Sequence, residues 1–134
     1  MELNKFLAEW HNDNPRILVH TSGSTGKPKP LMVEKRRMLN SARITCDFLG
    51  LKPGDTALLC MPLDYIAGKM MVVRSLQRDL RLTSVRPSSH PLADDALPSF
   101  TFAAMVPMQV YNTLKVPCER ERLMHCLLYT SPSP

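Results

Sequence analysis

The sequence lacks the features of several protein classes. Aromatic residues make up only 6% of the 134 residues, and none interrupts the densest basic run, Lys35, Arg36 and Arg37. Single-stranded nucleic acids are held by aromatic side chains interleaved with positive charge, so the net charge of +5 does not indicate a nucleic-acid-binding protein. No stretch approaches the roughly 18 apolar residues of a membrane span, and the N-terminus has no apolar run of signal-peptide type. We therefore expect neither membrane insertion nor export.

Cysteine and histidine are also sparse. The cysteines form no C-x-x-C pair, and His11, His20, His90 and His125 have no metal-ligand spacing. This excludes a zinc enzyme with protein-held metal and a disulfide framework. A reduced, cytoplasmic location fits the widely separated cysteines, which are Cys46, Cys60, Cys118 and Cys126.

What the sequence does contain is an alternation of apolar runs and helical patterns, within the composition of an ordinary globular domain. We expect strands at Ile17 to Val19, Thr56 to Met61, Arg81 to Val85 and Phe100 to Val106. We expect helices at Asn4 to Trp10, Val33 to Leu49, Ile66 to Leu76 and Pro107 to Leu114. The alternation predicts an α/β fold with a mainly parallel sheet flanked by helices, in which ligands gather at the carboxyl ends of strands.

The end of the sequence differs from the rest. Cys126 to Pro134 follows no periodic pattern and resembles the tails that arise when a truncated gene is read into foreign sequence. A frayed natural terminus is the alternative. We assign residues 1–124 to an incomplete domain and residues 125–134 to a non-native or disordered tail.

A loop rich in hydroxyls, glycines and lysines follows the first predicted strand. It consists of Thr21, Ser22, Gly23, Ser24, Thr25, Gly26, Lys27, Pro28 and Lys29. Glycines let backbone N–H groups approach phosphate oxygens, hydroxyls add donors, and lysines supply the opposing charge. It is not a Walker A motif, because Thr21 stands where that motif needs glycine and Pro28 where it needs Ser or Thr. Alone, such a loop also fits a solvated linker.

The order Thr-Ser-Gly-Ser-Thr-Gly-x-Pro-Lys after an apolar strand resembles the signature loop of the adenylate-forming superfamily, which includes acyl-CoA synthetases, luciferases and peptide-synthetase adenylation domains. The block Lys52-Pro53-Gly54-Asp55 and the run from Met61 to Arg74 extend the resemblance, which covers roughly Ile17 to Val110. Within the superfamily the sequence is most similar to o-succinylbenzoate-CoA ligases of menaquinone biosynthesis. The resemblance implies a partial N-terminal subdomain of the adenylate-forming fold.

The resemblance also implies a reaction. A carboxylate attacks the α-phosphate of Mg-ATP, and coenzyme A then displaces AMP from the acyl-adenylate; the implied cofactors are ATP, Mg²⁺ and coenzyme A. Lys29 would neutralise phosphate charge, whereas Lys27 fits solvent equally well. The other implied phosphate contacts are Thr21, Ser22, Gly23, Ser24, Thr25 and Gly26.

One position departs from the family pattern. Many relatives carry histidine where this chain has Tyr65, which suggests either a gate of the acyl pocket or ordinary packing at a strand end. The adenine, magnesium, ribose and catalytic-lysine motifs of the family are not found, so we expect no catalytic residue in the chain and no turnover by it alone. A non-catalytic nucleotide-binding module is the alternative function, and the identity of the acid and the oligomeric state are left open.

Overall fold

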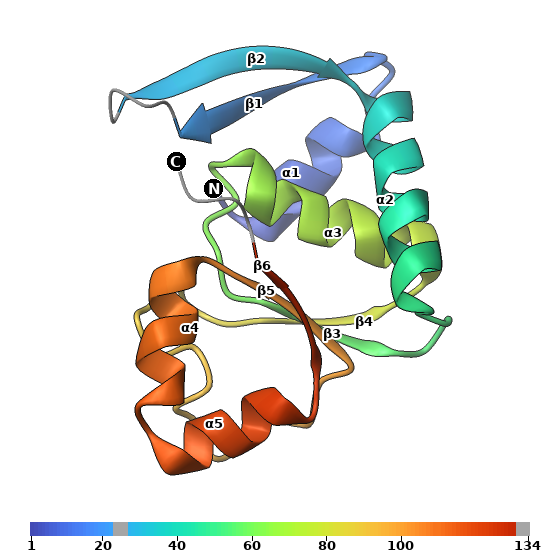
Figure 1. Ribbon diagram of the computed structural model, residues 1–134. Helices are drawn as coiled ribbons and strands as arrows, with labels where there is room; N and C mark the ends of the chain where they lie inside the picture. Colours follow the sequence, from blue (N-terminus) through green and yellow to red (C-terminus); the bar gives the residue numbers. More distant parts are fainter. Residues whose placement is uncertain (23–26, 131–134) are drawn as a thin grey trace.

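The computed structural model describes residues 1–22 and 27–130. A four-stranded parallel sheet forms the centre, and a two-stranded antiparallel hairpin lies apart from it (Figure 1). The sheet has the strand order β4-β3-β5-β6. Its strands are β3 (Thr56–Leu59), β4 (Arg81–Ser84), β5 (Phe102–Met105) and β6 (Leu127–Thr130). The α/β prediction with a mainly parallel sheet is confirmed.

Helices cover both faces of the sheet, as Figure 1 shows. One face is covered by α1 (Leu3–Trp10), α2 (Lys35–Leu49) and α3 (Ile66–Arg78), and the other by α4 (Pro107–Leu114) and α5 (Pro117–Met124). The helix α2 ends where Gly50 takes the left-handed conformation, with φ 68°, which glycine adopts without a Cβ clash. Pro107 begins α4, at a position where its missing N–H costs nothing.

The central strand β3 supplies both halves of the core. Ala57 and Leu59 pack with α1, α2 and α3, whereas Leu58 and the following Cys60 pack on the opposite side with Leu123 of α5. Successive side chains of a strand point to opposite faces, so a sheet covered on both faces needs apolar residues throughout. This explains the unbroken apolar run at 57–61.

Buried polar groups of α4 and α5 hold the long connection that follows β4. The Gln109 side chain donates to the carbonyl of Cys60 at 3.1 Å and to that of Ser88 at 2.9 Å. His90 Nδ1 lies 3.0 Å from the carboxylate of Glu119, which is only 5% exposed. The connection from Pro87 to Pro98 is therefore held against α4 and α5.

The hairpin corrects the predicted place of the first strand. β1 (Arg16–Ser22) pairs antiparallel with β2 (Pro28–Glu34) and belongs to no parallel sheet. A parallel neighbour needs a crossover connection of about a dozen residues or more, whereas β2 follows β1 closely. No sequence pattern predicts β2, because Pro28 and Pro30 lie within it and its first five residues are exposed.

Two further elements were not predicted. Residues 117–124 form α5, and residues 127–130 form β6, which pairs with β5. β5 supplies the backbone partners of residues 127–130. The assignment of residues 125–134 to a non-native or disordered tail stays a prediction. No helix within the described residues is long and apolar enough to cross a membrane.

Candidate nucleotide-phosphate site

The structure places the two ends of the predicted phosphate loop in the hairpin. Thr21 and Ser22 end β1, Pro28 begins β2, and Thr21 is the direct cross-strand partner of Lys29. Direct partners in an antiparallel pair point to the same face, so Thr21 and Lys29 share one face of the hairpin. The predicted contacts Gly23, Ser24, Thr25 and Gly26 lie outside the described residues.

That shared face is the one turned toward the helices. Ile17 and Val19 alternate with Thr21 along β1 and are buried in the core that contains α3. The structure also brings β1 into contact with α3, and α3 begins just beyond the carboxyl end of β3. Figure 1 shows the end of β1 and the start of β2 on the same side of the molecule as the start of α3. The two ends of the loop thus belong to the hairpin and not to the parallel sheet.

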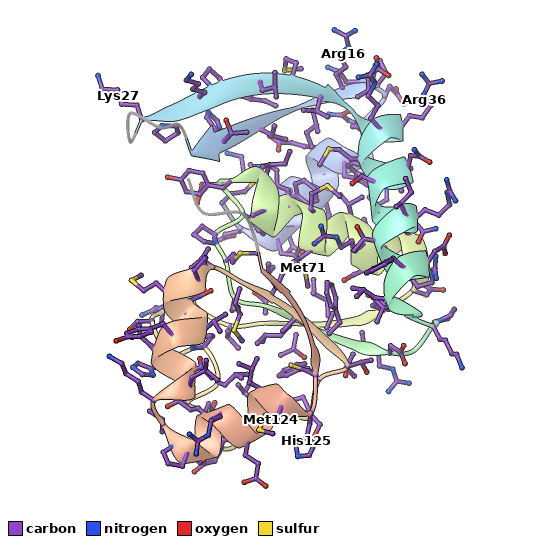
Figure 2. The ribbon with its side chains drawn as sticks, viewed as in Figure 1. Arg16, Lys27, Arg36, Met71, Met124 and His125 are labelled. Atoms are coloured by element: carbon purple, nitrogen blue, oxygen red, sulfur yellow. The ribbon has the colours of Figure 1, made fainter. Side chains whose placement is uncertain are left out.

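The two lysines of the loop are both exposed. Lys27 points away from the protein in Figure 2, in keeping with a solvated side chain. Lys29 lies within the ladder opposite Thr21, so its backbone is fixed while its ammonium can still reach an anion. His20 is half-buried and pairs with Pro30, so it lies on the face opposite to Thr21.

Tyr65 lies past the end of β3, in the connection to α3. It is half-buried and caps the N-terminus of α3 in an extended conformation. The segment from Pro62 to Tyr65, which we call the β3–α3 turn, connects the carboxyl end of β3 to this helix. Tyr65 is therefore a residue of the turn, and both the gate of the acyl pocket and ordinary packing stay predictions.

A cavity of about 320 Å³ lies at the same edge of the sheet. Its lining comes from the chain leaving β3, the chain leaving β4 and the start of the protein. Asp64 lines it and forms an ion pair with the N-terminal amine at 3.0 Å; this hydrogen bond lowers the pKa of the carboxyl. The other lining residues are Met1, Glu2, Leu3, Leu59, Met61, Pro62, Leu63, Ser84, Val85 and Pro87.

Sequence reasoning missed Lys69, which lies beneath the β3–α3 turn. The side chain is only 1% exposed, and its ammonium donates to the Leu63 carbonyl at 2.6 Å. Burial lowers the pKa of Lys69, while the charges of Glu9 and Asp64 act in the opposite direction. The signal was present in the sequence: a lysine in the first turn of α3 directly precedes the apolar run from Met70 to Val73.

Other chemistry-bearing side chains are not brought together. No group of three or more His, Cys, Asp or Glu side chains in the described part of the chain could hold a metal ion, so we assign no residue to Mg²⁺. A second cavity, of about 360 Å³, lies beside α5 and is lined by none of the predicted site residues. Burial raises the pKa of Cys60 to about 12, which makes its thiol a poor nucleophile.

Comparisons with known proteins agree with this geometry. A solved structure from Dyadobacter fermentans, described as an acyl-CoA synthetase (AMP-forming)/AMP-acid ligase II-like protein, has a TM-score of 0.85 and 38% identity, over 97% of this chain and 38% of that one. A 2-succinylbenzoate–CoA ligase from Salmonella typhimurium is 31% identical over 81% of this chain and 23% of its own length. A very long-chain fatty acid transport protein from Cochliobolus heterostrophus is 36% identical over 48% of this chain and 10% of its own.

The chain thus spans less than a quarter of these two curated relatives, as the shares of 23% and 10% show. The solved structure supports the predicted match to the N-terminal part of acyl-CoA synthetases. The family model described as AMP-binding enzyme matches residues 4–128, which includes the hairpin, the β3–α3 turn and every strand of the sheet except the last two residues of β6. The chain therefore belongs to the AMP-binding enzyme family.

Proposed function

We propose that this chain is the ATP-phosphate-binding, N-terminal part of an acid–CoA ligase that activates a carboxylic acid as its acyl-adenylate. The observation that carries the proposal is the pairing of Thr21 with Lys29, at the two ends of the signature loop, on the hairpin face turned toward α3. A hydroxyl and an ammonium side by side suit the oxygens of a polyphosphate. Family membership supports the reaction class.

In this proposal the loop serves adenylation. Its amide and hydroxyl donors, from Thr21 to Gly26, hold the β- and γ-phosphates and orient the α-phosphate for attack by the carboxylate. Lys29 stabilises the negative charge that develops on departing pyrophosphate. When bound, Mg²⁺ would supply further charge neutralisation, with ligands from outside the described residues. Before this attack the incoming acid passes the β3–α3 turn, where Tyr65 gates the acyl pocket.

We propose 2-succinylbenzoate as the acid and menaquinone biosynthesis as the setting. The proposal is supported by the run from Met61 to Arg74 and by the relative from Salmonella typhimurium. The relative named for fatty acid transport marks the main competing class, a long-chain acid. The four free thiols support a reduced, cytoplasmic location.

The test is ATP–pyrophosphate exchange by the longer protein that we propose carries this chain. Lys29→Ala and Thr25→Ala should each lower the exchange rate about a hundredfold or more, because each removes a donor aimed at developing charge. Lys27→Ala is the matched control, since Lys27 is exposed and points away from the protein; it should retain exchange. Unchanged exchange in either loop variant would reject the assignment.

The same measurement distinguishes the proposed ligase from the alternative function. A nucleotide-binding module without catalysis would bind ATP, lose that binding on Lys29→Ala, and give no exchange with any acid. The chain alone should give no acyl-CoA in the presence of ATP, Mg²⁺, coenzyme A and 2-succinylbenzoate. Detectable product would contradict the view that the catalytic groups lie elsewhere.

A further inference from the structure

Lys69 occupies a buried position, where an apolar residue would cost less desolvation free energy than a lysine. The side chain is 1% exposed, and no carboxylate among the described residues forms an ion pair with it. Lysine is almost never fully buried without a partner, because its ammonium loses hydration. Its neighbours Met70 and Met71 fill similar volumes in the same core. Packing alone therefore does not explain a lysine here.

The contacts of the ammonium converge on the β3–α3 turn. Lys69 lies in the first turn of α3, and its side chain extends back along the helix, as helical side chains do. Its Nζ lies 2.6 Å from the Leu63 carbonyl oxygen and 5.9 Å from the centre of the Phe6 ring. Phe6 is fully buried and stacks on Trp10 of α1. The ammonium is thus fixed from below by an aromatic face and aimed at one backbone carbonyl.

The turn has weak bonds of its own. The Tyr65 amide reaches the Pro62 carbonyl at 3.5 Å, the long limit of a hydrogen bond. The backbone amide of Lys69 donates to the Tyr65 carbonyl at 3.2 Å. The amide bond to Tyr65 is the first backbone bond of α3, whereas the ammonium of Lys69 adds a second link from the helix to the turn, at Leu63.

We infer that Lys69 is a positioning residue that fixes the β3–α3 turn, and through it the Tyr65 side chain, for the incoming carboxylic acid. The inference rests on the proposed function for its kinetic consequence, although the structural part stands without it. The charged groups around the ammonium are Glu9 of α1, Asp64 of the turn and the N-terminal amine that pairs with Asp64. None of them replaces the bond to Leu63.

The first experiment measures amide hydrogen exchange in this chain. Lys69→Met keeps the length and the apolar stem but removes the donor, so the amides of Tyr65 and Lys69 should exchange about tenfold faster. Met70→Leu, at the next buried position of α3, is the control and should leave both amides unchanged. Unchanged exchange at Tyr65 and Lys69 in Lys69→Met would overturn the inference.

The second experiment uses the longer ligase that we propose. Lys69→Met should raise KM for the acid about tenfold while KM for ATP stays within twofold of wild type, because the turn faces the acid and the loop holds the phosphates. Equal losses for both substrates, or none, would overturn the positioning role. If wild type shows no ligase activity with any acid, the proposed function fails, and the amide measurement still decides whether Lys69 holds the turn.

Discussion

Among the glycines in the described part of the chain, Gly68 is the one at which an added Cβ would meet other atoms. A Cβ built at Gly68 would lie 2.2 Å from the carbonyl oxygen of Pro62 and 2.8 Å from its carbon. Both atoms are backbone and cannot rotate away. The absence of a side chain therefore lets the first turn of α3 pack directly against the backbone of Pro62. This contact fixes the position of the β3–α3 turn.

Gly68→Ala should destabilise the protein by about 1–3 kcal/mol, because the turn or the helix must shift to admit the methyl group. In a helix interior without such a contact the same exchange is favourable, so the sign of the effect is diagnostic. Ser41→Ala, on the exposed face of α2, is the control and should stabilise slightly. Urea unfolding of the three proteins gives the comparison; a Gly68→Ala protein as stable as wild type would refute the close approach.

At the level of elements, two helices end in the same left-handed conformation with different residues. Gly50 ends α2 with φ 68°, and Asp79 ends α3 with φ 55°. Nothing lies within 4 Å of a Cβ built at Gly50, so a side chain there would meet backbone strain alone. The pair therefore isolates the cost of a Cβ in this conformation.

Gly50→Ala should cost about 1 kcal/mol of unfolding free energy, and Asp79→Gly should gain a similar or smaller amount. The measurement is the urea midpoint of each variant at constant slope. The explanation would be wrong if both substitutions changed stability in the same direction.

The elements that could be predicted are those whose own residues carry the signal. The helix at 35–49 shows its apolar positions and its Gly50 cap, and Pro107 marks the start of α4. The strand β2 and the helix α5 could not be predicted in this way. β2 is exposed and contains two prolines, and α5 buries only Glu119 and Leu123. Neither has a periodic apolar face of its own: β2 is stabilised by pairing with β1, and α5 by packing against α4.

In the candidate site, too, some features could be predicted from the sequence and others could not. The loop from Thr21 to Lys29 is read directly from residue types, because phosphate binding needs glycines, hydroxyls and lysines close together in sequence. The direct pairing of Thr21 with Lys29 depends on the register of the hairpin, which no pattern of neighbouring residues predicts. Lys69 was missed because its partner Leu63 and its platform Phe6 come from different segments.

For the whole molecule, the shared strand β3 ties the two core clusters together. Cys46 belongs to the cluster with α1, α2 and α3, and Cys60 to the cluster with α5. Alternate residues of β3 belong to the two clusters, so neither can come apart without disrupting the strand. We expect a single cooperative unfolding transition.

Thiol alkylation in a urea series tests this expectation. At pH 8 Cys118, which is exposed, should react without urea, whereas Cys46 and Cys60 should become reactive together at the global midpoint. Burial raises the pKa of both buried thiols, to about 12 for Cys60, which lowers the fraction of reactive thiolate in the folded protein. Raising the pH to 10 should therefore leave Cys60 protected without urea. Alkylation of Cys60 at lower urea than Cys46 would show that the two layers open separately.

The register of the hairpin has an evolutionary consequence. Deleting Leu31 alone would leave the signature from Thr21 to Lys29 intact in sequence. Yet with the start of α2 held in place, Lys29 would slide one step along the ladder, to the position opposite His20, and its side chain would turn to the outer face. A genome survey would still recognise such a protein by its sequence motif, while its lysine would point away from the proposed phosphate site.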